Sequence, residues 1–570
     1  MPFRPSRPLF ALALSALLAM PAAAQDQGGT AGAYLAARVA SSESDYREAA
    51  RWYDRLIEAG QTDPATLEGA LIAHLGLGEM ERAGELARQI IQKGGRGQPA
   101  FIAMMIDQTA REDYAALIDD IKAGRSIGKL IDDLVTAWAT LGDGRMSDAV
   151  GAFDAIAKAQ GLEAFGLYHK ALALASVGDF EGADNILSGR EAGTLSVTRR
   201  GVIAHAQILS QLERNADALD LLEKAFGAEV DPQIDALRAR LQAGEPVPFD
   251  VVRNAKDGIA EVFLSLASAL RGEAEDGYTL IYARAAAYLR PDFSDATLLA
   301  AGLLESLDQP ELAGEAYASI APEDPSYFVA EIGRADTLRA SGKTEAALEV
   351  LQALTRSHGT LIEVQSAYAD ALRREERFAD AIPAYTKAID LLPEVAQRHW
   401  TLFYSRGISN ERAGNWDAAE ADFRKALELN PDQPQVLNYL GYSFVDRGEN
   451  LDEALDMIQR AVAAQPDAGY IIDSLAWAYF RLGRYEEAVE PMERASLLEP
   501  VDPVVTDHLG DVYWAVGRKL EARFQWHRAL SFDPEEKEAK RIRRKLEVGL
   551  DAVLAEEGAK PLTEVANGGN

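Results

Sequence analysis

The chain has no cysteine among its 570 residues. A disulfide, a catalytic thiol and a lipid-modified cysteine are therefore all excluded. Histidine is also scarce, with seven residues spread along the chain and no H-E-x-x-H pattern. Because a zinc site needs several ligands at a defined spacing, we expect no metal and no cofactor.

Long apolar runs are nearly absent too, and the one exception covers residues 9–20. It is about half as long as the ~20 residues that span a bilayer. Two arginines precede it and small residues follow it, which is typical of a secretory signal peptide. We therefore expect residues 1–24 to be a signal peptide that is cleaved between Ala24 and Gln25; the alternative is a buried N-terminal helix.

Positive charge is in short supply, because 58 Lys and Arg face 90 Asp and Glu and the net charge is -32. This excess repels nucleic acid and anionic lipid, so neither is an expected partner. Basic residues gather once, between Lys537 and Lys545, but they are interleaved with Glu538 and Ile542. This pattern favours a solvated terminal helix over a binding patch.

What the chain does have is a period of 34 residues. Prolines recur at intervals of 34, 68, 38, 35, 34 and 34 residues, and the interval of 68 is two periods. A fixed period of this length with a helical pattern inside it is typical of a solenoid of helix pairs. In such a fold each added repeat displays more surface, so we expect an all-α fold that binds partners rather than an enzyme. The prolines are Pro291, Pro325, Pro393, Pro431, Pro466, Pro500 and Pro534.

The clearest repeat runs from Tyr470 to Pro500, and its frame recurs in the repeats that end at Pro466 and Pro534. Alanines 476 and 488 are small where two antiparallel helices are expected to cross, at a separation of about 8–10 Å. Gly483 suits the left-handed residue that ends the first helix. The residues that define this frame are Leu475, Ala476, Tyr479, Gly483, Tyr485, Ala488, Met492, Ala495 and Pro500.

Looser copies of the frame extend over nearly all of the chain, with one interruption. The pattern is lost between Gly227 and Asn254, where the run Gly244–Pro248 cannot continue a helix. We expect a hinge or a change of curvature there; the alternative is a longer loop within one rigid spiral. The predicted parts are an N-terminal degenerate array (25–226), the interruption (227–255), a C-terminal array (256–534), a capping helix (535–557) and a disordered tail (558–570).

The frame resembles that of the tetratricopeptide repeat family. The resemblance implies helix hairpins stacked into a right-handed superhelical α-solenoid, with a concave groove lined by the first helix of each pair. It also implies that protein or peptide partners bind in this groove. The expected function is therefore a non-enzymatic interaction scaffold or adaptor.

Residues 437–534, which begin LNYLGYSFVDRGENLDEALDMIQRA, resemble more narrowly a group of secreted multi-repeat proteobacterial proteins. That group includes outer-membrane lipoproteins that act as adaptors of a periplasmic carboxyl-terminal processing protease. With the signal peptide, this resemblance implies a periplasmic protein of the cell envelope. It leaves an alternative function open, namely an activating or substrate-presenting subunit of a periplasmic protease or peptidoglycan enzyme. The chain departs from the lipoprotein members because it lacks the anchoring cysteine.

The family's groove positions can be transferred onto the three best repeats. They are rich in Tyr and Trp, which are common at the energetic centres of interfaces; the alternative for each aromatic residue is packing between adjacent repeats. Repeats that clamp a peptide carboxylate use Lys, Arg and Asn here, whereas this chain has three aspartates, so a basic or aromatic peptide is favoured. The candidate groove residues are Asn438, Tyr439, Tyr442, Asp446, Tyr470, Asp473, Trp477, Phe480, Arg481, Asp507, His508, Asp511 and Trp514.

Two short segments resemble motifs of enzymes, but neither match is complete. Ser341–Thr344 resembles part of a phosphate-binding loop, but Thr337 stands where that loop requires a glycine and no strand precedes it. Gly342 instead falls where an inter-helix turn is expected. Ser126–Lys129 matches the short motif of serine acyl enzymes without either companion motif. We expect no catalytic residue.

Overall fold

The computed structural model describes residues 25–190, 198–227, 231–559 and 562. The predicted signal peptide and most of the predicted tail lie outside these residues. The chain divides into two compact units, an N-terminal unit (Met1–Leu354) and a C-terminal unit (Thr355–Asn570). The division lies inside the predicted array 256–534, and the predicted interruption at 227–255 lies inside the N-terminal unit.

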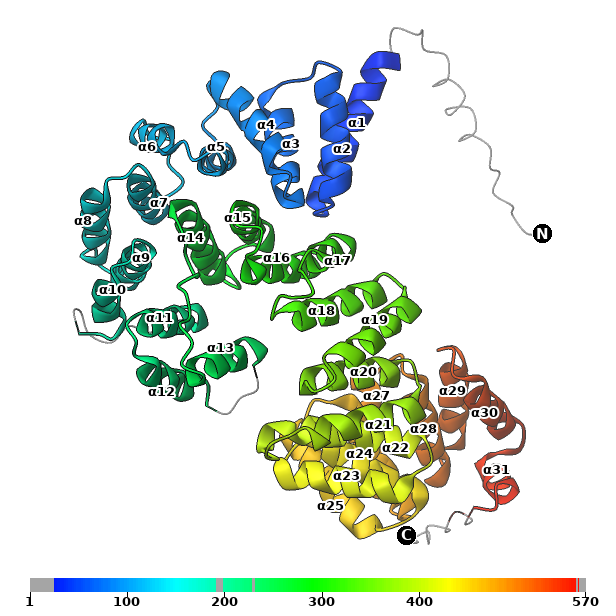
Figure 1. Cartoon of the computed structure of the whole chain (residues 1–570). Coiled ribbons are helices and arrows are strands. Elements are labelled where there is room, and N and C mark those ends of the chain that lie inside the picture. Colours follow the sequence, from blue (N-terminus) through cyan, green and yellow to red (C-terminus); the bar gives the residue numbers. More distant parts are fainter. Residues whose placement is uncertain (1–24, 191–197, 228–230, 560–561, 563–570) are drawn as a thin grey trace. The chain divides into compact units, whose positions relative to one another are not determined.

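The described residues form helices joined by short connections, which confirms the predicted all-α fold of helix hairpins (Figure 1). The N-terminal unit contains α1 (Gln25–Ser42), α2 (Tyr46–Glu58), α3 (Pro64–Leu77), α4 (Met80–Gln92), α5 (Gln98–Ala110), α6 (Tyr114–Lys122), α7 (Lys129–Gly142), α8 (Met146–Ala157), α9 (Glu163–Ser176), α10 (Phe180–Leu187), α11 (Arg199–Gln211), α12 (Asn215–Phe226), α13 (Pro232–Gln242), α14 (Ala255–Leu270), α15 (Asp276–Leu289), α16 (Ser294–Ser306), α17 (Pro310–Ala318) and α18 (Tyr327–Ala340).

Helix α19 (Thr344–Ser357) includes the point of division. The C-terminal unit continues with α20 (Ile362–Arg374), α21 (Phe378–Asp390), the 3₁₀ turn η3 (Gln397–His399), α22 (Trp400–Arg412), α23 (Trp416–Leu429), α24 (Pro434–Arg447), α25 (Leu451–Ala464), α26 (Gly469–Arg481), α27 (Tyr485–Leu498), α28 (Pro503–Ala515), α29 (Lys519–Leu530), α30 (Glu536–Val548) and α31 (Leu550–Glu556).

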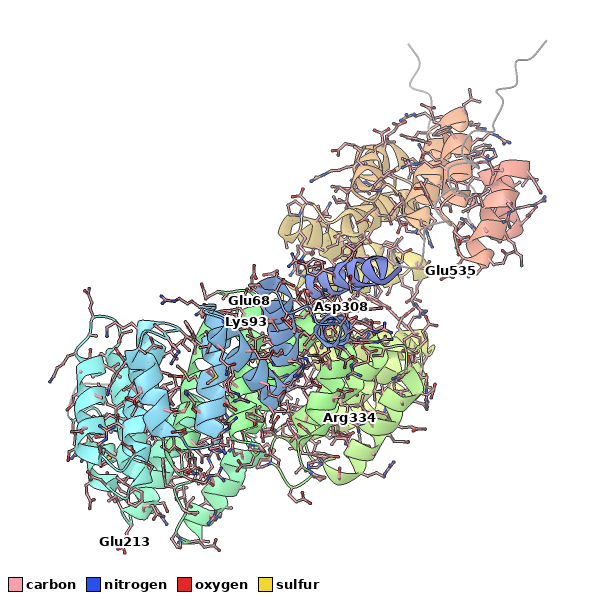
Figure 2. The ribbon with its side chains drawn as sticks, turned by 90° about the horizontal axis from the view of Figure 1, so that it is seen from above. Glu68, Lys93, Glu213, Asp308, Arg334 and Glu535 are labelled. Atoms are coloured by element: carbon pink, nitrogen blue, oxygen red, sulfur yellow. The ribbon has the colours of Figure 1, made fainter. Side chains whose placement is uncertain are left out.

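The turn inside each hairpin needs one residue in the left-handed conformation. Gly483 supplies it after α26 with a φ of 75°, as the sequence predicts. The following N–H, of Arg484, then donates to the carbonyl oxygen of Tyr479 over 2.9 Å, which closes the helix end. Gly342 occupies the same kind of turn with a φ of 72°. Figure 2 labels Glu213 and Asp308, two residues in such turns that are not glycine. Their φ values are 58° and 57°.

The predicted contacts between the two helices of a hairpin are present. Ala476 on α26 and Ala488 on α27 are both fully buried. At the equivalent crossing of α28 and α29 the residue is glycine, and a Cβ added to Gly510 would lie 2.4 Å from the ring of Trp526. Small residues at these positions therefore set how closely the helices approach.

In the N-terminal unit, α14 and α15 pack against earlier helices of the array. Helix α14 contacts α5, α7 and α9, and α15 contacts α3 and α5. Gly258 of α14 lies directly on the indole of Trp138 in α7, because a Cβ there would come within 2.3 Å of the ring. These odd-numbered helices are the first helices of their hairpins, so the chain's own helices cover that face of the array. The role of 227–255 as a hinge stays a prediction.

The predicted capping helix is divided in two. Gly549, with a φ of 87°, separates α30 from α31. Ile542, Leu550 and Val553 are buried, as the apolar spacing predicts. The prediction of a solvated basic face is wrong for Lys545, whose side chain is fully buried. The physical reason is a pair of aspartates on α28, which neutralises its charge.

A candidate binding pocket in the C-terminal unit

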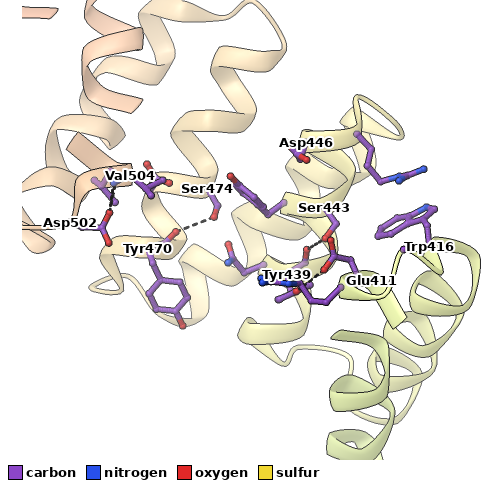
Figure 3. Close-up of a pocket in the computed structure, with 16 residues that line it drawn as sticks. Glu411, Trp416, Tyr439, Ser443, Asp446, Tyr470, Ser474, Asp502 and Val504 are labelled. Atoms are coloured by element: carbon purple, nitrogen blue, oxygen red, sulfur yellow. Dashed lines mark hydrogen bonds between the residues drawn. The ribbon is translucent and has the colours of Figure 1, made fainter. Parts of the chain in front are cut away.

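A cavity of about 500 Å³ opens between α22, α24, α26 and the turn that precedes α28 (Figure 3). Six of the thirteen groove residues that the sequence predicts line it. These six are Asn438, Tyr439, Tyr442, Asp446, Tyr470 and Asp473. The other lining residues are Glu411, Arg412, Gly414, Trp416, Ser443, Arg447, Ser474, Asp502, Val504 and Val505.

The helical period of α24 explains why its polar residues face the cavity. Leu437, Leu440 and Phe444 are buried on one side of this helix and fix it to its neighbours. Asn438 and Tyr442 are four residues apart and therefore share another face. The sequence pattern of α24 thus separates a packing face from a pocket face.

Two tyrosines of this wall are held in defined positions. The hydroxyl of Tyr439 donates to Oε2 of Glu411 over 3.1 Å, and its ring packs 5.1 Å from that of Phe423. Burial raises the pKa of Tyr439, and the charge of Glu411 raises it further. Burial also raises the pKa of Tyr442, with Asp473 and Asp446 adding to the effect. Both hydroxyls therefore stay protonated at neutral pH.

The arginines at the rim are engaged with aromatic rings. The guanidinium of Arg447 lies 4.6 Å from the ring centre of Trp416, and its Nε donates to Glu449 over 3.2 Å. The guanidinium of Arg412 lies 5.2 Å from the ring centre of Phe378. Asp446 is held only weakly. Its side chain is 71% exposed, and its carboxylate lies 3.9 Å from the guanidinium of Arg481.

One buried side-chain polar atom of the pocket has no hydrogen-bond partner among the described residues. The side-chain oxygen Oδ1 of Asn438 is buried and accepts no hydrogen bond. Leaving such an atom unsatisfied costs roughly 1–3 kcal/mol. Native structures contain few of these atoms, so each one needs an explanation.

The other seven predicted groove residues do not line the cavity. Several of them join neighbouring first helices instead. Trp477 stacks between Phe480 and His508, with ring centres 4.7 Å and 4.0 Å away. His508 Nδ1 lies 3.0 Å from Asp473, and Trp514 Nε1 donates to Asp551 over 2.7 Å. Arg481 donates to the backbone of Asp446 in the preceding hairpin.

Two of the three aspartates on which the expectation of a basic ligand rested are already neutralised. Lys545 Nζ donates to Asp507 over 2.7 Å and to both oxygens of Asp511 over 2.7 and 2.8 Å. Arg541 adds a second charge within 3.8 Å. Burial raises the pKa of Asp507, while the charge of Lys545 opposes that rise. Helix α30 follows α28 by one repeat period, so it takes the position of the first helix of a further hairpin. Its basic residues therefore lie against these two aspartates.

The pair of His508 and Asp473 predicts a dependence of stability on pH. Burial alone would lower the pKa of His508, but the charge and hydrogen bond of Asp473, with the charges of Asp507 and Asp511, raise it overall. A raised pKa stabilises the fold fully below the unfolded value of about 6.5, and this stabilisation is lost as the pH rises through the folded value. The difference in free energy of unfolding between the parent and His508→Gln should therefore shrink above pH ~6.5. A difference that is constant with pH would contradict the assignment.

Some lining residues escaped the sequence analysis because only the three best repeats were used for the transfer. Arg412 stands one period before Asp446, so the repeat spacing alone could have found it. Asp502 had a different signal. It precedes Pro503 and accepts hydrogen bonds from the backbone of Val504 and Val505, which marks it as the N-cap of α28.

The described residues contain neither a cluster of metal ligands nor a membrane-spanning helix. Within that part of the chain, no three His, Asp or Glu side chains converge to hold a metal ion. None of its helices is long and apolar enough to cross a membrane.

Comparison with known proteins finds a similarity in the C-terminal half of the chain. The model of the tetratricopeptide repeat family matches residues 332–397, 404–469 and 448–503. These stretches are thus similar to tetratricopeptide repeats, and they include most of the residues that line the pocket.

Relatives match over similar short lengths. The TPR repeat-containing protein PA4667 of Pseudomonas aeruginosa is 28% identical over 169 residues, which are 30% of this chain and 28% of that protein. The E3 ubiquitin-protein ligase CHIP of Arabidopsis thaliana is 29% identical over 132 residues, or 21% of this chain and 45% of that protein. The human protein O-mannosyl-transferase TMTC1 is 25% identical over 166 residues, which are 29% of this chain and 19% of that protein. The matches thus span less than half of each relative.

Solved structures resemble the chain only distantly. The Cut9–Hcn1 hetero-tetramer of the APC/C matches with a TM-score of 0.38 and 16% identity, over 91% of this chain and 96% of that one. YrrB, described as a TPR protein with an unusual peptide-binding site, matches with a TM-score of 0.28 and 19% identity, over 33% of this chain and 94% of that one. At these scores the likeness supports no inference about function.

Proposed function

We propose, from its tetratricopeptide repeats, that the chain is a non-enzymatic scaffold or adaptor of the bacterial cell envelope that binds a protein or peptide partner in the pocket between α22, α24 and α26. The observation that carries the proposal is the cavity of about 500 Å³, lined by three tyrosines, a tryptophan and several carboxylates. Concave sites with aromatic walls and a few polar groups are the usual places for ligands. Tyr and Trp also dominate the energetics of protein interfaces.

The packing of the N-terminal unit supports a site in the C-terminal unit. Helices α14 and α15 cover the first helices α3, α5, α7 and α9. A partner would have to displace these helices to reach the same face there. In the C-terminal unit, by contrast, Tyr470 is 47% exposed beside the open cavity.

The envelope location rests on the signal-peptide pattern of residues 1–24. Its test is the N-terminal residue of the chain recovered from the periplasm of the host that makes it. Recovery with Gln25 at the N-terminus supports the proposal, and an uncleaved chain in the cytoplasm contradicts it.

Capture of partners from an envelope extract tests the binding function. The parent chain is compared with the pocket variant Tyr470→Ala/Asp446→Asn, in which both replaced side chains are exposed. We expect the pocket variant to lose the partner by about tenfold or more, because it removes one aromatic anchor and one charge. The matched control is Phe524→Ala/Glu490→Gln, which removes one exposed aromatic ring and one exposed acid elsewhere in the same unit. Equal recovery by the parent and the pocket variant would place binding outside the pocket.

A finer function is a role as activating or substrate-presenting adaptor of a periplasmic protease or peptidoglycan enzyme. It is supported by the resemblance of residues 437–534 to secreted multi-repeat proteins. If it holds, adding the chain raises the rate at which the captured hydrolase cleaves its substrate. A ternary complex with unchanged turnover supports a scaffold without this activity.

A further inference from the structure

Two hydrogen-bond acceptors of the pocket have no close donor. Oδ1 of Asn438 is buried without a donor. The carboxylate of Asp446 is exposed and has only a distant cationic neighbour. By contrast, the hydroxyls of Ser443 and Ser474 already donate to backbone oxygens of their own helices over 2.8 and 3.0 Å (Figure 3). A ligand that complements these open groups must bring donors.

The charges around the cavity favour a positive ligand. Four carboxylates line it, those of Glu411, Asp446, Asp473 and Asp502, against two guanidinium groups. Both guanidinium groups lie against aromatic rings, at Trp416 and Phe378. The raised pKa of Tyr442, to which Asp473 and Asp446 contribute after burial, reflects the same negative surroundings.

The aromatic walls suit a cation as well. Tyr439, Tyr442 and Tyr470 line the cavity together with Trp416. Aromatic faces attract ammonium and guanidinium groups electrostatically. The contact of Arg447 with Trp416, at 4.6 Å, is an example of this chemistry at the rim.

We propose that the pocket selects a lysine or arginine side chain of the bound peptide, with Asp446 accepting hydrogen bonds from its cationic end and the tyrosines packing around its stem. This inference rests on the proposed peptide-binding function and names the chemistry of its partner. It differs from the expectation based on sequence, because Asp507 and Asp511 take no part: Lys545 already occupies them.

Immobilised peptides with blocked ends test the selection on the full chain. Each nonapeptide has random flanks and one fixed central residue, which is lysine, arginine, norleucine, acetyl-lysine or glutamate. The lysine and arginine peptides should bind about tenfold more tightly than the norleucine and acetyl-lysine peptides, because only they carry a charged donor. The glutamate peptides should bind most weakly, and added salt should reduce the difference between lysine and norleucine.

Variants locate the selection in this pocket. Asp446→Asn should lose most of the preference for lysine, while Glu490→Gln, which removes an exposed acid on α27, should keep it.

Each outcome separates this inference from the proposed function. Peptides that bind equally well whatever the central residue overturn the cation site and leave the peptide-binding function standing. A lysine preference that survives Asp446→Asn overturns the location. Absence of peptide binding also overturns the cation site, and capture from the envelope extract then decides the proposed function separately.

Discussion

Replacing Lys545 by alanine is expected to destabilise the end of the C-terminal unit by about 3–5 kcal/mol. The side chain is fully buried, and its ammonium group bridges Asp507 and Asp511 at 2.7–2.8 Å. Asp511 also accepts a hydrogen bond of 2.9 Å from Trp526 Nε1, so it cannot turn away without a further loss. The substitution therefore leaves two carboxylates buried beside each other without their main counter-charge. Hydrogen exchange of the amides of α28 and α30 in the full chain measures the effect.

Lys540→Ala is the matched control, because Lys540 lies on the same helix with its side chain 71% exposed. It should change the stability by less than about 0.5 kcal/mol. Asp507→Asn combined with Lys545→Ala should recover part of the loss, since one of the two uncompensated charges is then removed. Equal exchange in the Lys545→Ala and Lys540→Ala variants would show that the buried ion pairs do not hold the cap.

Trp138→Ala is expected to destabilise the N-terminal unit by about 3–5 kcal/mol. The indole is fully buried, packs edge-on against Phe153 with ring centres 5.5 Å apart, and lies against Gly258 of α14. Its Nε1 donates to Nδ1 of His169 over 3.1 Å. Burial lowers the pKa of His169 to about 3, so this histidine stays neutral and accepts the bond. The variant thus creates a cavity and removes a buried hydrogen bond at the contact between α7 and α14.

We expect this destabilisation to appear as faster hydrogen exchange in α14 and α15, because both helices depend on contacts with the earlier helices of the array. Gly258→Val should act on the same contact from the other side, since a Cβ at this position would overlap the indole. Tyr34→Ala removes an aromatic side chain that is 38% exposed and serves as the control. Unchanged protection of α14 in Trp138→Ala would mean that this contact does not secure the helix.

The contacts inside each hairpin could be predicted from sequence because they follow from local geometry. Gly483 ends a helix and the alanines at 476 and 488 mark a crossing, and each has one physical reason within a single repeat. The N-terminal repeats are harder to recognise. In two of their hairpins Glu213 and Asp308 take the left-handed turn position, which glycine fills at lower cost, so the glycine signal is missing from those two turns.

Contacts between distant segments could not be predicted in the same way. Helix α14 meets α7 through a glycine and a tryptophan that are 120 positions apart, and no local pattern joins them. Within the candidate site, the family frame found four of the six residues of α24 that line the cavity. It did not separate these from Asp507 and Asp511, because their neutralisation depends on Lys545 in a helix outside the recognised repeats.

Site-directed photo-crosslinking shows whether a partner binds in the pocket. A benzophenone amino acid replaces Tyr470 at the pocket in one chain and Phe524 on α29 in another, and both side chains are substantially exposed. Each chain is mixed with envelope extract and irradiated. We expect the chain labelled at position 470 to crosslink to the partner recovered by the parent, and the chain labelled at position 524 to give no such crosslink. Crosslinking from position 524 alone would contradict the assignment of the pocket as the binding site.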